Sequence, residues 1–140
     1  MRRTTLTQYN VLMPNDPKRF AKVTKLLAKA RVGARSVLTA SSGRSAAVQF
    51  LAHRDPALRR LLEKNATLVQ ENLVFQFEAP NHPWELHRVA QALAEAGIRI
   101  ISLFSNASGT KMHVILAVDQ PANAVETISR LGFSPDYLVC

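Results

Sequence analysis

The sequence predicts an α+β protein made of two tandem β-α-β-β-α-β repeats. The tetrapeptide Pro-Asn-x-Pro stands at residues 14–17 and again at residues 80–83, and the residues around it recur at the same offset. Apolar residues alternate in some segments, as in strands, and recur every three or four residues in others, as in helices. A repeat of this length is too long for a solenoid and fits a duplicated small domain.

The repeat needs no gap from about residue 9 to residue 64, when that segment is set against the second half of the chain. Identical residues occur in this tetrapeptide, which we call the corner, along the segment that follows it and in a later glycine-containing bend. The pairs include Pro14 and Pro80, Asn15 and Asn81, Pro17 and Pro83, Val23 and Val89, Leu27 and Leu93, and Gly43 and Gly109. We therefore expect the two halves to share one topology.

In the second half, the alternating segment 73–79 predicts a strand in which Leu73, Phe75, Phe77 and Ala79 share one side. Pro83 suits the first position of a helix, and Gly97 can take the left-handed conformation that closes it. The buried stripe of this helix is predicted to be Leu86, Val89, Leu93 and Ala96. The remaining elements are predicted as strands at 98–106 and 111–119 around a glycine bend, a helix between Pro121 and Gly132, and a short strand at 136–140.

In the first half, a helix is predicted over about 17–30, and a second one opens with Asp55 as its N-cap and Pro56 as its first residue. The first helix is expected to be buried through Phe20, Val23, Leu27 and Ala30. Each half then forms a ferredoxin-like antiparallel sheet with both helices on one face. We place the two domains at residues 1–70 and 71–140.

The sheet face away from the helices is expected to be apolar in both halves. Its predicted members are Leu12, Val37 and Leu51 in the first half and Val74, Ile101, Leu103 and Ile115 in the second. A sheet face open to water would carry polar residues, and an exposed apolar patch of this size usually marks an interface. We therefore expect these faces to be covered by each other or by a second chain, which favours a homodimer.

Charge is divided unequally along the 140 residues. Residues 1–70 carry 14 Lys and Arg against 3 Asp and Glu, whereas residues 71–140 carry 4 against 7. A basic half can meet nucleic acid, an acidic protein or the acidic half of another copy, although an ordinary solvated surface gives the same pattern. The basic N-terminus has no apolar segment behind it, the longest aliphatic run (114–118) is too short for a bilayer, and the single cysteine is the terminal Cys140. These features favour a cytoplasmic protein without a membrane anchor.

The repeated corner resembles the ACT domain, a small ligand-binding module of amino-acid metabolism. The segments NHPWEL (81–86) and GIRI (97–100) match its signature, and NDPKRF (15–20) and RVGA (31–34) match it more loosely. The resemblance covers nearly the whole chain as two tandem copies. It implies a noncatalytic regulatory protein that binds an amino acid or a similar small anion and acts through the arrangement of domains or subunits, or through a regulated protein partner.

The corner has the chemistry that such a ligand needs. A helix start offers backbone N–H groups and the positive end of the helix dipole to a carboxylate, and nearby side-chain oxygens can accept from an α-ammonium group. The resemblance also implies that the second strand of a neighbouring domain completes the site. The predicted ligand-binding residues are Asn15, Asp16, Lys18, Arg19, Asn81, His82, Trp84, Glu85 and Arg99.

The chain departs from the family pattern at the corner. Lys18 and Trp84 stand where the family has a glycine, and Asn15 and Asn81 stand where it has an aspartate. The alternative interpretation of the corner is a rigid turn that caps a helix. Trp84 is open to three interpretations: an interface anchor, a lid over the pocket or a core residue.

No other pattern indicates chemistry. The four histidines lack metal-ligand spacing, no glycine-rich phosphate loop occurs, and no carboxylate pair is placed for acid–base catalysis. We therefore predict no enzyme activity, no metal and no cofactor. A basic adaptor for nucleic acid or an acidic protein is the alternative function. It depends on a lysine stripe at Lys18, Lys22, Lys25 and Lys29, whereas the inner strands lack the aromatic residues on which RNA stacks in a similar fold.

Overall fold

The computed structural model describes residues 6–32 and 37–138. Within these limits the chain forms two compact units, one of residues 6–72 and one that begins at Leu73. We call them the N unit and the C unit. Three positions used above, Gly33 and Ala34 of the looser signature and the terminal Cys140, lie outside the described residues.

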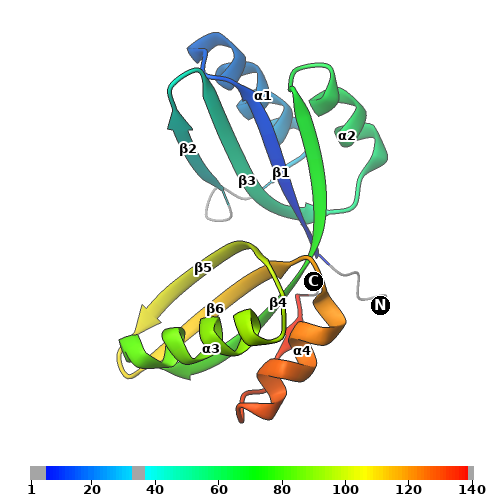
Figure 1. Ribbon diagram of the computed structural model, residues 1–140. Coiled ribbons are helices and arrows are strands. Elements are labelled where there is room, and N and C mark those ends of the chain that lie inside the picture. Colours follow the sequence, from blue (N-terminus) through cyan, green and yellow to red (C-terminus); the bar gives the residue numbers. More distant parts are fainter. Residues whose placement is uncertain (1–5, 33–36, 139–140) are drawn as a thin grey trace. The chain divides into compact units, whose positions relative to one another are not determined.

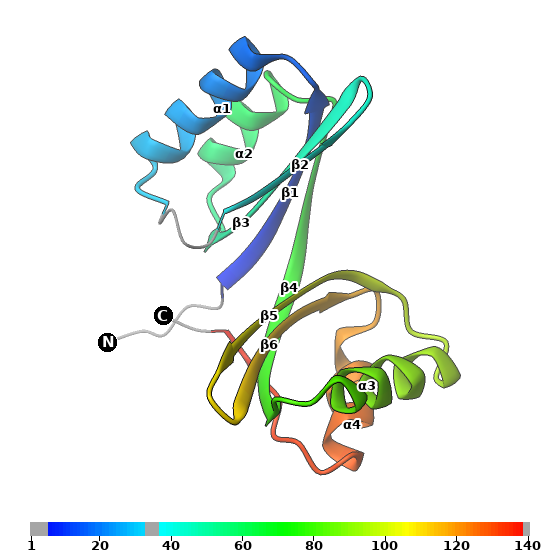
Figure 2. The ribbon, with the colours of Figure 1, turned by 90° about the vertical axis from the view of Figure 1, so that its left-hand side faces the viewer.

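The N unit contains β1 (Leu6–Pro14), α1 (Pro17–Lys29), β2 (Leu38–Ser42), β3 (Ser45–His53), α2 (Pro56–Glu63) and the first residues of β4 (Leu68–Pro80). The strands are ordered β2-β3-β1-β4. The pairs β1–β3 and β2–β3 are antiparallel, with Val11 opposite Val48 and Ala40 opposite Ala47. Both views show α1 and α2 side by side on one face of these strands (Figures 1 and 2).

The C unit contains the rest of β4, followed by α3 (Pro83–Glu95), β5 (Ile100–Ser108), β6 (Lys111–Val118), α4 (Pro121–Arg130) and β7 (Asp136–Tyr137). Here β4 lies between β6 and β7, and β5 pairs with the other edge of β6. The pairs β4–β6, β4–β7 and β5–β6 are antiparallel. The prediction of an α+β fold with antiparallel strands and four helices is confirmed.

Each unit has a hydrophobic core of its own between strands and helices. The N-unit core is centred on Tyr9, Val11, Val23, Leu27, Val48, Phe50 and Leu62. The C-unit core is centred on Phe75, Phe77, Val89, Leu93, Val114, Leu116 and Ile128. Aromatic and branched aliphatic residues of the strands therefore meet the apolar stripes of the helices in both units, as the alternation and helical spacing predict.

Proline and glycine set the ends of the helices. The four helices in the described part of the chain all have proline in their first turn, at Pro17, Pro56, Pro83 and Pro121. Asp55 caps α2 by accepting hydrogen bonds from the N–H groups of Ala57 (3.0 Å) and Leu58 (3.2 Å). Gly97 follows α3 with a φ of 72°, a value that side chains with a Cβ rarely adopt. The predicted roles of these residues are confirmed.

Four predicted core positions are wrong, and three of them lie at the ends of helices. Phe20 is 37% exposed, and Ala30 and Ala96 are also exposed. Phe20 lies in the first turn of α1, whereas Ala30 and Ala96 are the C-caps of α1 and α3, so each has core neighbours on one side only. Leu73 is 46% exposed, although Phe75 and Phe77 on the same strand are buried.

The prediction that Leu103 lies on the sheet face away from the helices is wrong, because β5 contains an irregularity. The register against β6 shifts between Ile100 and Ser102, so that Leu103 lies opposite Leu116 and packs against the core. One extra residue moves every following side chain to the other face. Phe104 consequently faces away from the core, opposite Ile115, and is 48% exposed.

Candidate ligand-binding corners

Two strand–helix corners carry most of the predicted ligand-binding residues. We call residues 14–19 the N corner and residues 80–85 the C corner. In the N corner, Asn15 donates from its backbone N–H to the carbonyl of Arg44 (2.8 Å) and from Nδ2 to the carbonyl of Gly43 (3.0 Å). In the C corner, Asn81 makes the same two bonds to Thr110 (2.8 Å) and Gly109 (3.1 Å). Each asparagine therefore fastens its corner to the hairpin turn beside it.

The hairpin turn presents these carbonyls because of its glycine. Gly43 and Gly109 have φ values of 59° and 61°, and each is the first of the two residues between paired strand ends. Glycine at this place gives the turn whose twist suits an antiparallel hairpin. The repeated asparagine and glycine thus form one structural motif in each unit, and the amide nitrogen of each asparagine is engaged within the chain.

The residue after each asparagine caps the helix. Asp16 accepts from the N–H of Lys18 through Oδ1 (3.1 Å), and its carbonyl accepts from the N–H of Phe20 (3.0 Å). His82 accepts from the N–H of Trp84 through Nδ1 (3.2 Å), and its carbonyl accepts from the N–H of Glu85 (3.0 Å). The chain's own caps therefore occupy these helix-start donors, and a ligand carboxylate that used the N–H of Lys18 or Trp84 would displace a cap side chain.

The two corners differ in charge. Lys18 and Arg19 of the N corner, and Arg44 in the adjacent turn, form no ion pair with any described carboxylate. In the C corner the only full charge belongs to Glu85, which pairs with Arg88 of the same helix at 2.9 Å. The N corner is therefore the more favourable of the two for an anion.

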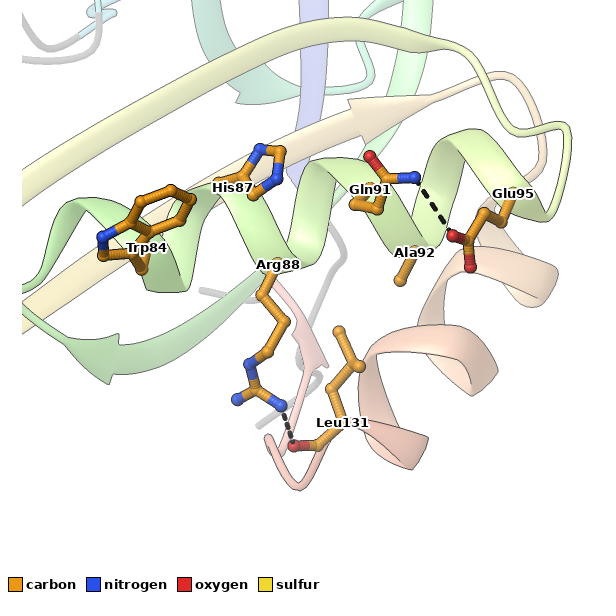
Figure 3. Close-up of a pocket in the computed structure, with 7 residues that line it drawn as sticks. All are labelled: Trp84, His87, Arg88, Gln91, Ala92, Glu95 and Leu131. Atoms are coloured by element: carbon orange, nitrogen blue, oxygen red, sulfur yellow. Dashed lines mark hydrogen bonds between the residues drawn. The ribbon is translucent and has the colours of Figure 1, made fainter.

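Trp84 is not a core residue. It is 69% exposed, and its ring packs edge-on against His87 with 5.5 Å between ring centroids. It stands at one end of a groove of about 430 Å³ along the outer side of α3 (Figure 3). The groove is lined by Trp84, His87, Arg88, Gln91, Ala92, Glu95 and Leu131.

Arg88, one of the lining residues, connects α3 to the end of α4. Its guanidinium donates to Glu85 and to the carbonyl of Leu131 (3.1 Å), and it lies 5.0 Å from the ring centroid of Phe133. Figure 3 shows its side chain reaching from α3 to the end of α4. This role of Arg88 is not among those predicted from the sequence. The Glu85–Arg88 spacing of three residues indicates the ion pair, but the contact with Leu131 spans 43 residues and has no sequence signal.

Arg99 lies apart from the C corner of its own unit. It follows α3, whereas the C corner precedes that helix, and 13 helical residues extend over about 20 Å. Its backbone N–H donates to Asp119 at 2.9 Å, which fixes the start of β5 against the end of β6. The predicted site residues thus fall in three separate places: the N corner, the C corner and the segment before β5.

Two further observations concern the described residues as a whole. No group of three or more His, Cys, Asp or Glu residues is arranged to hold a metal ion in the ranges that the structure describes. No helix within those ranges combines the length and the apolar character that a membrane span requires.

The fold is similar to that of several solved structures. No family model matches the sequence, and no curated protein matches it significantly. Protein BT0572 from Bacteroides thetaiotaomicron aligns with 20% identity and a TM-score of 0.71, covering 96% of this chain and 94% of that one. The ligand-free regulatory subunit of aspartate kinase from Thermus thermophilus aligns with 16% identity and a TM-score of 0.61, covering 90% and 91%. The corresponding subunit from Thermus flavus aligns with 19% identity and a TM-score of 0.58, covering 91% and 90%. The fold implied by the resemblance to the ACT domain is therefore confirmed, and the chain has an ACT-like fold.

Proposed function

We propose that this chain is a noncatalytic regulatory module that binds an amino acid or a similar small anion at its strand–helix corners. The observation that carries the proposal is the likeness, over nine tenths of both chains, to a regulatory subunit of aspartate kinase. In this proposal the chain consists of two tandem ferredoxin-like β-α-β-β-α-β repeats, residues 1–70 and 71–140. It forms a homodimer in the cytoplasm and acts on a regulated partner.

The N corner is proposed to bind the carboxylate of the ligand. Lys18, Arg19 and the neighbouring Arg44 supply positive charge and form no ion pair with any described carboxylate. Asn15 uses its Nδ2 toward the hairpin turn, which leaves its Oδ1 for an α-ammonium group, and Asp16 provides a second acceptor. Because the cap formed by Asp16 is exposed, binding can exchange the cap bond for a bond to the ligand at small net cost.

The C corner is proposed to favour a ligand with an apolar side chain. Trp84 stands where the family has glycine, so its exposed ring offers a surface for apolar contact instead of a close approach to the backbone. His82, Asn81 and Glu85 supply polar groups around that ring. Arg99 is proposed to complete the corner of a neighbouring domain, since it is too far along α3 to serve its own.

Regulation then follows from bridging. A ligand that contacts a corner on one domain and a strand on another binds more tightly when those two domains are correctly arranged. It therefore shifts the population toward that arrangement, by as much as its affinities for the two arrangements differ. A partner that recognises the same arrangement is regulated through this shift.

The protein contains a single tryptophan, Trp84, which makes the C corner directly observable. The experiment is a titration of the full chain with each common amino acid and with small dicarboxylates, followed by Trp84 fluorescence and by thermal melting. A ligand at about 100 times its Kd should stabilise the protein by about 2.7 kcal/mol. Binding at the C corner should change the Trp84 emission, whereas binding at the N corner should raise the melting temperature without that change.

The variant Arg19→Ala should abolish the rise in melting temperature caused by a ligand of the N corner. The control variant Lys64→Ala, which removes an exposed cation elsewhere in the N unit, should retain that rise. Sedimentation with and without ligand tests the homodimer. If none of these compounds moves the melting transition or the Trp84 emission, the proposed function is wrong.

A further inference from the structure

Helix α1 has a charge composition that sets it apart from the other helices. Its 13 residues include five cations and no carboxylate. Each of the other three described helices instead contains an ion pair along its own surface: Arg59–Glu63 in α2, Glu85–Arg88 in α3 and Arg130–Glu126 in α4. A helix on a solvated surface gains from such pairs, so the charge of α1 calls for another explanation.

The lysines of α1 form one continuous stripe. Lys18, Lys22, Lys25 and Lys29 are separated by four, three and four residues and are all exposed. This spacing places them on one side of the helix, over a length of about 16 Å. The core residues Val23 and Leu27 lie on the other side. The stripe therefore faces away from the sheet that α1 covers.

No carboxylate in the described part of the N unit forms an ion pair with this stripe. Asp16 and Asp55 serve as helix caps. Glu63 and Glu71 both pair with Arg59, at 2.7 and 2.9 Å, and the hydrogen bonds that Arg59 donates to Glu63 and then to Glu71 raise the pKa of that arginine. Neighbouring like charges at these spacings destabilise a helix by about 0.2–0.5 kcal/mol per pair. The stripe thus lowers the stability of α1 unless an external anion is bound.

We propose that the α1 stripe binds the phosphate backbone of nucleic acid without reading its sequence. A duplex exposes roughly ten phosphate charges over the length of the stripe, so a linear polyanion can contact all four lysines at once. Lysine is a point-charge donor suited to phosphate. This proposal does not rest on the proposed regulatory function: Lys18 belongs to both sites, but Lys22, Lys25 and Lys29 lie outside the N corner.

Other anionic partners fit the stripe less well. A membrane-bound helix inserts its apolar side into the lipid, whereas the apolar side of α1 is used in the core through Val23 and Leu27. Protein interfaces are depleted in lysine and depend on aromatic or arginine anchors at their centre, and the stripe contains neither. A small anion can contact only one or two of the four lysines.

The experiment measures the binding of the full chain to a fluorescently labelled 20-base-pair duplex, of two unrelated sequences, at several salt concentrations. Four phosphate contacts predict that log K falls with log salt at a slope of about −3.6, which is about a 150-fold loss between about 50 and about 200 mM salt. The variant Lys22→Gln with Lys25→Gln should halve that slope and leave about a 12-fold loss over the same range. Glutamine has nearly the same helix propensity as lysine, and circular dichroism verifies that the variant is folded.

The matched control is Lys111→Gln with Arg130→Gln, which removes two exposed cations from the C unit and lowers the net charge equally. It should bind the duplex as the unaltered chain does. Equal losses in the two double variants would mean that only net charge matters, and the proposal would be overturned. It would also be overturned by the absence of duplex binding at about 50 mM salt, or by tighter binding to polyglutamate or to phosphatidylserine vesicles than to the duplex.

Discussion

At the scale of single residues, Tyr9 connects the N-unit core to the start of α2. Its side chain is fully buried and its ring stacks on Phe50, with 5.0 Å between centroids and 8° between planes. The hydroxyl oxygen accepts from the N–H of Asp55 at 2.9 Å. Asp55 is the N-cap of α2, so the side chain of Tyr9 contacts both a core residue of the sheet and the helix cap.

Tyr9→Phe should therefore destabilise the N unit by about 1 kcal/mol, because the N–H of Asp55 loses its acceptor while the ring stacking remains. Burial raises the pKa of Tyr9 above its ordinary value of 10.0, and nearby Glu71 adds to this effect, although the hydrogen bond from Asp55 opposes it. A raised pKa in the folded state means that its contribution to stability is complete below pH 10.0 and is lost as pH rises through the folded pKa.

The measurement is urea unfolding between pH 7 and pH 11, and its readout is the stability difference between the unaltered chain and Tyr9→Phe. That difference should shrink above pH 10.0. The control is Tyr137→Phe, at a residue that is 38% exposed. A stability difference that stays constant across this pH range would contradict the burial argument.

At the scale of elements, α1 is expected to be more stable once its lysine stripe is interrupted. Lys25 has Lys22 and Lys29 as neighbours at three and four residues. Lys25→Glu should replace two repulsions by two attractions and stabilise the N unit by roughly 1 kcal/mol at low salt. Lys25→Gln removes the repulsions alone and should give about half of that gain.

Urea unfolding at low salt and at about 1 M salt separates charge from helix propensity, since the Debye length falls to about 3 Å at the higher concentration. The gain from Lys25→Glu should then nearly vanish, while the same substitution weakens duplex binding at low salt. If the stability gained by Lys25→Glu persists at high salt, the gain comes from helix propensity and not from the removal of repulsion within the stripe.

Helices whose ends are marked by proline or glycine could be predicted from the sequence, whereas strand register could not. Pro83 and Gly97 mark the ends of α3 because one lacks an N–H and the other tolerates a positive φ. The irregularity after Ile100 has no such mark, because Ile101 and Leu103 alternate with polar or aromatic neighbours like any strand. Its consequence, an exposed Phe104 and a core-facing Leu103, depends on pairing with β6.

At the scale of the whole molecule, the repeat predicted where the two corners lie but not how their polar groups are used. Asn15 and Asn81 were recognisable because both halves retain them. Their bonds to Gly43 and Gly109 each cross 28 residues, so they depend on folded hairpins that the corner sequence does not contain. The contact of Arg88 with Leu131 was hidden for the same reason.

The two units have separate cores, and each should respond to the loss of its own core residues. Leu62 in the N unit and Leu93 in the C unit are both fully buried. Replacing either by alanine should cost about 2–5 kcal/mol. A single small domain of this size rarely gains more than about 3–5 kcal/mol from its core, so each substitution should bring its own unit close to unfolding.

Trp84 lies in the C unit and packs against His87, so its fluorescence reports that unit, whereas far-ultraviolet circular dichroism reports both. Leu93→Ala should lower the urea midpoint seen by Trp84 and split the circular dichroism transition into two steps. Leu62→Ala should also split the circular dichroism transition but leave the Trp84 midpoint in place. If Leu62→Ala lowers the Trp84 midpoint as much as Leu93→Ala does, the two cores unfold as one cooperative structure, and the stability of each depends on the other.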